Sequence, residues 1–123
     1  MIIDHVGINV SNYAASKAFF ASALAPLGIT LALEIQGNAG FGSNGRPQFW
    51  FCVGQPVRAP MHVAFVAESR QQVRDFYRAA LAAGGVDNGA PGLRTIYHPS
   101  YYGAFVIGPD GHNVEAVCHR PEE

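Results

Sequence analysis

Charged residues are scarce in this sequence. Only 14% of the 123 residues are Asp, Glu, Lys or Arg, and 8 basic against 9 acidic side chains leave a formal net charge of -1. A protein that binds nucleic acid through its phosphates needs a basic surface, and this composition provides no basic stripe. We therefore expect no nucleic-acid partner.

Cysteine is equally rare. Cys52 and Cys118 are the only two, and they form neither a CxxC metal knuckle nor a disulfide framework. Two free thiols are typical of a reducing compartment, and Cys118 should be inert. The chain begins with no basic segment followed by a signal-type apolar core, and no apolar run is long enough to span a bilayer. The sequence thus predicts a cytoplasmic protein with no membrane partner.

Apolar and turn-forming residues are abundant instead. Apolar residues make up 49% of the chain, which also contains 14 glycines and 8 prolines. This length and composition suit one compact domain over residues 1–123, rich in strands and turns.

Two stretches of the chain resemble each other. Residues 4–10 (DHVGINV) and 61–67 (MHVAFVA) are short apolar runs with a histidine near the start, and each leads into a helix-like segment. An ungapped match over a strand, a helix and its terminal glycine indicates a duplicated module. The matching pairs are His5 with His62, Val6 with Val63, Phe19 with Phe76, Ala23 with Ala80, Leu24 with Leu81, and Gly28 with Gly85.

Each module should contain a strand, a helix and three further strands. In the first module, about 1–54, we expect strands at 2–10, 29–36, around Phe41 and at 48–53, with a helix capped by Ser11 or Asn12 and ended by Pro26 and Gly28. A linker at 54–60 follows. In the second module, about 61–119, we expect a strand at 61–67, a helix with a capping box at 69–72, a loop at 86–92, a strand at 93–98, and a hairpin of 101–107 with 112–118 around the turn 108–111.

The predicted fold class is α+β. Each module is a small open sheet with a helix on one face and nothing on the other. Two such modules should form a curved mixed sheet, a cupped half-barrel with the helices on its outer face, and the hollow is the expected ligand site.

Three side chains suggest a metal centre in that hollow. Glu115 is a lone carboxylate in an apolar strand, and carboxylates are seldom buried unless they are paired or bind a metal. His5, His62 and Glu115 come from different strands, so together they offer two imidazoles and one carboxylate. Such a set leaves coordination positions open for water or substrate. His112 and His119 are expected at the surface.

The order His5, His62, Glu115 resembles that of the vicinal oxygen chelate superfamily. This superfamily includes glyoxalase I, extradiol dioxygenases, fosfomycin-modifying thiol transferases and bleomycin-resistance proteins. The resemblance covers nearly the whole chain, and its most specific pieces are residues 4–7 (DHVG), 62–65 (HVAF) and 108–115 (GPDGHNVE). It implies paired βαβββ modules, a homodimer, a small-molecule substrate with two adjacent oxygens, and a divalent metal (Fe, Ni, Zn or Mn) held by His5, His62 and Glu115.

The chain also departs from these relatives. Glyoxalase I has a fourth ligand, a glutamate, where alignment places Trp50, or Phe49 or Cys52 after a shift. Extradiol dioxygenases carry a tyrosine where this chain has Phe105, so His98, Tyr101 or Tyr102 are the alternatives for moving a proton. The fosfomycin-modifying enzymes carry a catalytic threonine where this chain has Gly7.

Two hypotheses about function remain. The first is a metal-dependent lyase, isomerase or dioxygenase whose substrate lies against Gly7, Trp50 and Phe105, with His98, Tyr101 or Tyr102 as the catalytic group. The second is a non-catalytic module that binds a flat ligand, like bleomycin-resistance proteins; a thiol transferase of the fosfomycin-modifying type is a further alternative.

Overall fold

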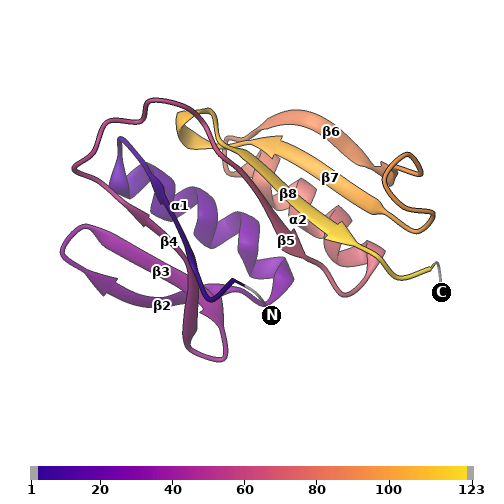
Figure 1. Ribbon diagram of the computed structural model, residues 1–123, viewed down its shortest axis with the longest axis horizontal. Coiled ribbons are helices and arrows are strands. Elements are labelled where there is room, and N and C mark those ends of the chain that lie inside the picture. Colours follow the sequence, from indigo (N-terminus) through magenta and orange to yellow (C-terminus); the bar gives the residue numbers. More distant parts are fainter. Residues whose placement is uncertain (1–2, 122–123) are drawn as a thin grey trace.

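The protein consists of two βαβββ modules in tandem, as Figure 1 shows for the computed structural model, which describes residues 3–121. The first module contains β1 (Val6–Asn9), α1 (Tyr13–Leu24), the 3-10 turn η1 (Ala25–Leu27), β2 (Thr30–Ile35), β3 (Asn38–Ser43) and β4 (Arg46–Cys52). The second contains β5 (His62–Val66), α2 (Arg70–Ala82), β6 (Val86–Leu93), β7 (Tyr102–Ile107), the 3-10 turn η2 (Pro109–Gly111) and β8 (Asn113–Cys118). The predicted α+β fold with duplicated modules is confirmed.

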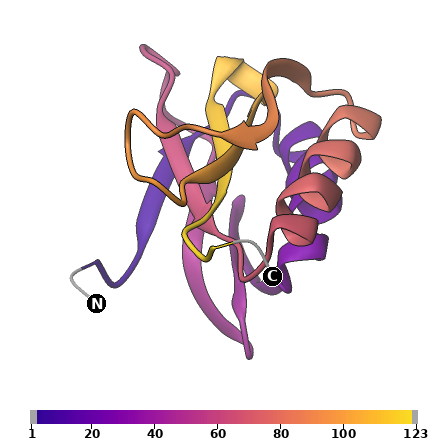
Figure 2. The same cartoon turned by 90° about the vertical axis from the view of Figure 1, so that its right-hand side faces the viewer.

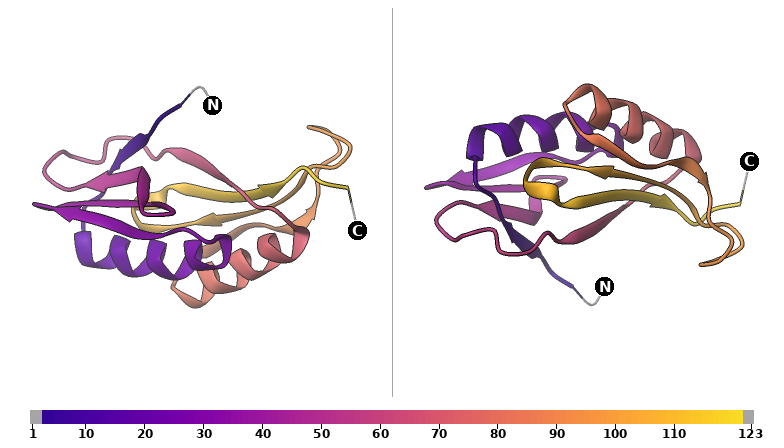
Figure 3. Two further views of the ribbon diagram at one scale, coloured as in Figure 1. Left: turned by 90° about the horizontal axis from the view of Figure 1, so that it is seen from below. Right: turned by 90° about the horizontal axis from the view of Figure 1, so that it is seen from above.

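Both modules have the same sheet topology. The strand orders are β1-β4-β3-β2 and β5-β8-β7-β6, and the first strand of each module runs parallel to the last. Both helices lie on one side of the two open sheets (Figures 2 and 3). We call the opposite side of each sheet its helix-free face. No helix in the described part of the chain is long and apolar enough to cross a membrane.

Side-chain caps fix where the helices begin. The Asn12 side chain accepts a hydrogen bond of 3.0 Å from the Ala15 N–H, so Asn12 rather than Ser11 caps α1. The Ser69 hydroxyl likewise accepts from the Gln72 N–H at 3.1 Å and caps α2. Such caps satisfy amide groups that have no partner within the helix. After α1 and η1, Gly28 takes a left-handed φ of 76°, which turns the chain into β2.

One apolar core joins the two modules. The helices contact each other, and Phe20 packs against both Phe49 and Phe51 with ring centroids 4.9 and 5.6 Å apart. Phe49 of β4 also meets Phe65 of β5 edge-on, with centroids 5.1 Å apart. Because this last contact joins one strand from each half, the halves are stabilised by shared burial.

One boundary differs from the sequence-based expectations in the first module, and two segments differ in the second. The first strand begins at Val6, so His5 lies immediately before β1; Ile2, at the predicted start, lies outside the described residues. The predicted loop 86–92 is instead part of the strand β6, and the predicted strand 93–98 is wrong, because β6 ends at Leu93 and 94–101 forms a loop. The strand is possible because β6 is an edge strand, where Pro91 sacrifices no ladder bond, and irregular pairing around Gly89 absorbs the distortion.

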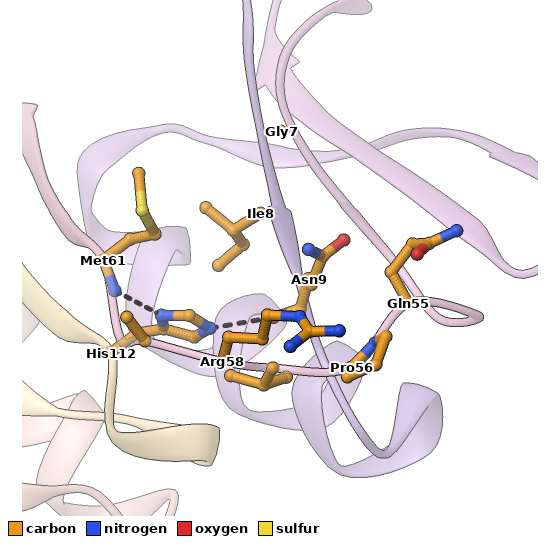
Figure 4. A pocket seen from close by; sticks show the side chains of 10 residues that line it. Gly7, Ile8, Asn9, Gln55, Pro56, Arg58, Met61 and His112 are labelled. Carbon is orange, nitrogen blue, oxygen red and sulfur yellow. Dashed lines mark hydrogen bonds between the residues drawn. The ribbon is translucent and has the colours of Figure 1, made fainter.

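His112 is buried, which corrects the expectation that it lies at the surface. Its ring joins the two modules, because Nδ1 accepts from the Met61 N–H at 2.8 Å and Nε2 lies 2.9 Å from the Asn9 carbonyl (Figure 4). A neutral imidazole offers one acceptor and one donor, which suits one N–H and one C=O. These two backbone groups explain why a polar ring is retained at this position.

The buried hydroxyl of Ser16 gives a test of the core. Ser16 on α1 is fully buried, and its Oγ has no hydrogen-bond partner among the described residues. Ser16→Ala removes an uncompensated polar group, so we expect the free energy of unfolding to rise by about 1 kcal/mol in urea denaturation.

Ser22→Ala, on the exposed side of the same helix, is the matched control. It gains only helix propensity, about 0.5 kcal/mol. A Ser16→Ala protein less stable than the wild type would show that the hydroxyl has a stabilising partner.

Candidate functional site

The strand register identifies equivalent positions in the two modules. Gly7 pairs with Trp50, and Ala64 pairs with Glu115. Gly7 and Ala64 each follow their module's histidine by two residues. Trp50 is therefore the structural counterpart of Glu115, and the first module has an indole where the second has a carboxylate.

The Glu115 carboxylate is held by two other side chains. One oxygen, Oε1, lies 2.8 Å from Nε2 of His62, and the Tyr101 hydroxyl donates a hydrogen bond to Oε2. Glu115 is only 1% exposed, whereas the His62 side chain is 54% exposed. A buried carboxylate needs such partners because it has lost its hydration. We call His62, Glu115 and Tyr101 the carboxylate triad.

Tyr101 is kept in its neutral form. Partial burial, and then the hydrogen bond to Glu115, raise the pKa of its phenol above the ordinary value of 10.0. A phenol with a raised pKa keeps its proton and donates a hydrogen bond to the carboxylate, whereas a phenolate would repel it. Near neutral pH, Tyr101 is thus a hydrogen-bond donor.

The triad lies on the helix-free face of the second sheet. Phe105 of β7 pairs with Glu115, and the neighbouring Ala104 and Ala116 are buried in the core. Since side chains alternate along a strand, Phe105 and Glu115 face away from α2. The Phe105 ring lies 6.2 Å from that of His62.

Of the two tyrosines that the sequence left open, Tyr101 is the one beside Glu115. Tyr102 lies on the helix side, where the Arg70 and Arg74 guanidinium carbons are 5.1 and 5.8 Å from its ring centroid. Arg74 also donates to the Tyr102 hydroxyl at 3.3 Å. Tyr102 therefore packs with α2, away from the triad.

His98 lies further from the carboxylate than Tyr101. Its ring centroid is 5.4 Å from that of His119, which in turn is 5.2 Å from the Tyr101 ring. Both histidines are exposed, as expected for His119. A role for His98 stays a prediction.

His5 lies in the first module and does not meet the triad within one chain. Its Nδ1 lies 2.8 Å from the Asp4 carboxylate, which also accepts from Arg46 at 3.2 Å. The hydrogen bond with His5, followed by that from Arg46, lowers the pKa of Asp4. The His5 side chain is 60% exposed and borders a shallow cavity of about 390 Å³ together with Gly7 and Trp50.

Within one chain, therefore, two of the three predicted metal ligands come together. Among residues 3–121, no group of three or more His, Cys, Asp or Glu side chains is placed to hold a metal ion. His62 and Glu115 are adjacent nitrogen and oxygen donors of the kinds that bind Fe, Ni, Zn or Mn. They supply two of the three ligands that the predicted site needs.

The sequence reasoning missed Arg94. It follows β6, and its guanidinium carbon lies 5.4 Å from the Phe105 ring centroid. Two glycines precede it, at positions 89 and 92. Glycines that permit a close approach of another group to the backbone were the available signal.

The chain belongs to the Glyoxalase/Bleomycin resistance protein/Dioxygenase superfamily, whose family model matches residues 2–116. It is similar to a glyoxalase/bleomycin resistance protein from Albidiferax ferrireducens T118, with 25% identity, coverage of 96% of this chain and 99% of that chain, and a TM-score of 0.80. A comparison with curated proteins finds no match.

More distant structures share the fold. A glyoxalase/bleomycin resistance protein/dioxygenase family enzyme from Burkholderia phytofirmans PsJN is 18% identical, with coverage of 95% and 98% of the two chains and a TM-score of 0.72. A glyoxalase-related enzyme from Fulvimarina pelagi is 16% identical, with coverage of 94% and 86% and a TM-score of 0.72. The superfamily thus includes enzymes.

The hydrogen bond from Tyr101 can be tested by its effect on stability. Tyr101→Phe removes a donor to a buried carboxylate, so the free energy of unfolding should fall by about 1 to 3 kcal/mol in urea denaturation. Tyr97→Phe is the control, because Tyr97 is 66% exposed and its ring is unchanged by the substitution. Equal stability of the two variants would contradict the role given to Tyr101.

Proposed function

We propose that this protein is a metal-dependent enzyme that acts on a small substrate with two adjacent oxygens. We further propose that two copies of the chain complete its metal site. The observation that carries the proposal is the contact between His62 and the buried Glu115 carboxylate. These two donors, from strands distant in the sequence, are two of the three ligands that the superfamily resemblance implies.

The position of His5 supports a site shared between two chains. His5 is exposed and immediately precedes β1, which is an edge strand of the first sheet; His62 begins β5, an edge strand of the second. Exposed edges favour association unless they are covered. In a dimer with two-fold symmetry, His5 of each copy would complete the pair His62 and Glu115 of the other, giving two equivalent sites.

The apolar surface near these edges supports the same arrangement. Several large apolar side chains of the described chain remain exposed near the two histidines or on the strands beside them. A second copy would bury part of this surface, which favours association. These residues are Ile3, Ile35, Val53, Met61 and Val66, and Ile35 borders the same cavity as His5.

The residues define a division of roles. His5, His62 and Glu115 would hold the metal, which when bound supplies a Lewis acid and a template for the two substrate oxygens. Tyr101 would hold or deliver a proton beside Glu115. Trp50 and Gly7 would provide a flat wall that carries no metal ligand. Because Trp50 replaces the fourth ligand of glyoxalase I, an oxygenase or a lyase using one carboxylate suits this chain better than glyoxalase I chemistry.

A second candidate function is ligand binding without catalysis. Here the observation in favour is that His62 and Glu115 satisfy each other directly, at 2.8 Å. A pair that is satisfied in this way needs no metal, and the cavity beside Trp50 would then sequester a flat molecule.

Metal analysis of mixed variants distinguishes these possibilities. His5→Ala and Glu115→Ala each remove one ligand from every site, so each purified variant should lose stoichiometric nickel or zinc. If the two variants are unfolded together and refolded as a mixture, mixed dimers should regain one complete site. Random pairing then gives about a quarter of the wild-type metal content by elemental analysis.

His119→Ala and Glu68→Ala are the controls, because both residues are exposed and neither is a proposed ligand. Metal loss in each variant without recovery on mixing would refute a shared site. Unchanged metal content in both variants would refute the metal site itself. A metal-free wild type that still binds a flat aromatic compound, followed by Trp50 fluorescence, would favour the second candidate.

A further inference from the structure

Arg94 is held in a fixed position by its surroundings. Its Nη1 donates to the Gly92 carbonyl at 2.7 Å, and its Nη2 donates to the Ala90 carbonyl at 2.8 Å. Phe105 lies 5.4 Å from the guanidinium carbon. These contacts fix a side chain that would otherwise have many rotamers.

Two glycines make room for this guanidinium. A Cβ atom added at Gly89 would lie 3.1 Å from Arg94 Nη2, and one added at Gly92 would lie 3.1 Å from Nη1. Gly89 also has a φ of 151°, which side chains rarely adopt. The irregular pairing of β6 therefore leaves a side-chain-free stretch of backbone against which the guanidinium lies.

The guanidinium lies on the same face as the carboxylate triad. Phe105 and Glu115 pair across β7 and β8 and face away from α2. The Phe105 ring centroid is 6.2 Å from that of the His62 ring and 5.4 Å from the Arg94 guanidinium carbon. One aromatic side chain thus links the cation to the proposed metal ligands.

Among residues 3–121, no carboxylate forms an ion pair with Arg94. Its hydrogen-bond partners are neutral carbonyls. The guanidinium has five N–H donors, and the carbonyls take two. A partly buried cation with spare donors and no counter-ion attracts an anionic ligand.

We propose that Arg94 binds a carboxylate of the substrate, so that the protein selects small flat acids that also carry two adjacent oxygens. This inference rests on the proposed function, which places the two oxygens near His62 and Glu115. The planar fork of a guanidinium matches a carboxylate with two parallel hydrogen bonds. Arg94 is then the residue that determines specificity for an acid over its neutral analogue.

Paired ligands that differ only in the carboxylate test this inference. Titration calorimetry of the nickel-loaded protein, without oxygen, should show that 3,4-dihydroxybenzoate binds about tenfold or more tightly than catechol, because a charged hydrogen bond is involved. In Arg94→Gln the difference should vanish while the affinity for catechol stays the same. Arg94→Lys, which keeps a cation but loses the fork, should retain part of the preference.

Arg78→Gln removes the same charge from the exposed surface of α2 and should leave the preference intact. Equal affinity for the two ligands in the wild type would overturn the inference, and so would a full preference for 3,4-dihydroxybenzoate in Arg94→Gln. If Arg94→Gln does not fold, a full preference in Arg94→Lys would overturn it. Failure to take up nickel counts against the proposed function alone. In that case the metal-free protein is titrated with benzoate and benzamide. The inference stands only if the protein with Arg94 binds benzoate more tightly than benzamide.

Discussion

The carboxylate of Glu115 is the constraint around which the second module is built. Moving an ionised carboxylate out of water is costly unless hydrogen bonds or charges compensate. Here His62 and Tyr101 approach its two oxygens, and they come from β5 and from the loop before β7. The parallel pairing of β5 with β8 is what brings the imidazole to the acid. The contact between His62 and Glu115 therefore depends on the strand order of the second sheet.

Duplication has produced two modules of the same topology with different interior chemistry. The same register position holds Trp50 in one sheet and Glu115 in the other. Trp50 borders an apolar cavity, whereas Glu115 anchors a polar cluster. A two-fold pairing of whole chains would place these unlike surfaces opposite each other, so that each site receives one apolar wall and one polar wall. Such a site, with one apolar wall and one polar wall, suits a flat ligand that carries oxygens along one edge.

Local patterns predicted much of the fold. The repeat anchored by His5 and His62 identified the modules, and the caps at Asn12 and Ser69 marked both helix starts. The strand β6 was missed because Gly and Pro normally signal a loop, whereas the edge of a sheet tolerates them. Burial of His112 was missed because it depends on backbone groups of residues distant in the sequence.

The site was less predictable for the same physical reason. Residue types and the family order singled out His62 and Glu115, but the side of the strand taken by Tyr101 and Tyr102 follows from local register, which sequence does not reveal. The meeting of Phe49 with Phe65 has a separate consequence. Since each ring packs against the other half, we expect that neither repeat folds on its own despite its complete topology. The chain should unfold in a single cooperative transition, and a fragment cut at the linker would expose an aromatic surface and aggregate.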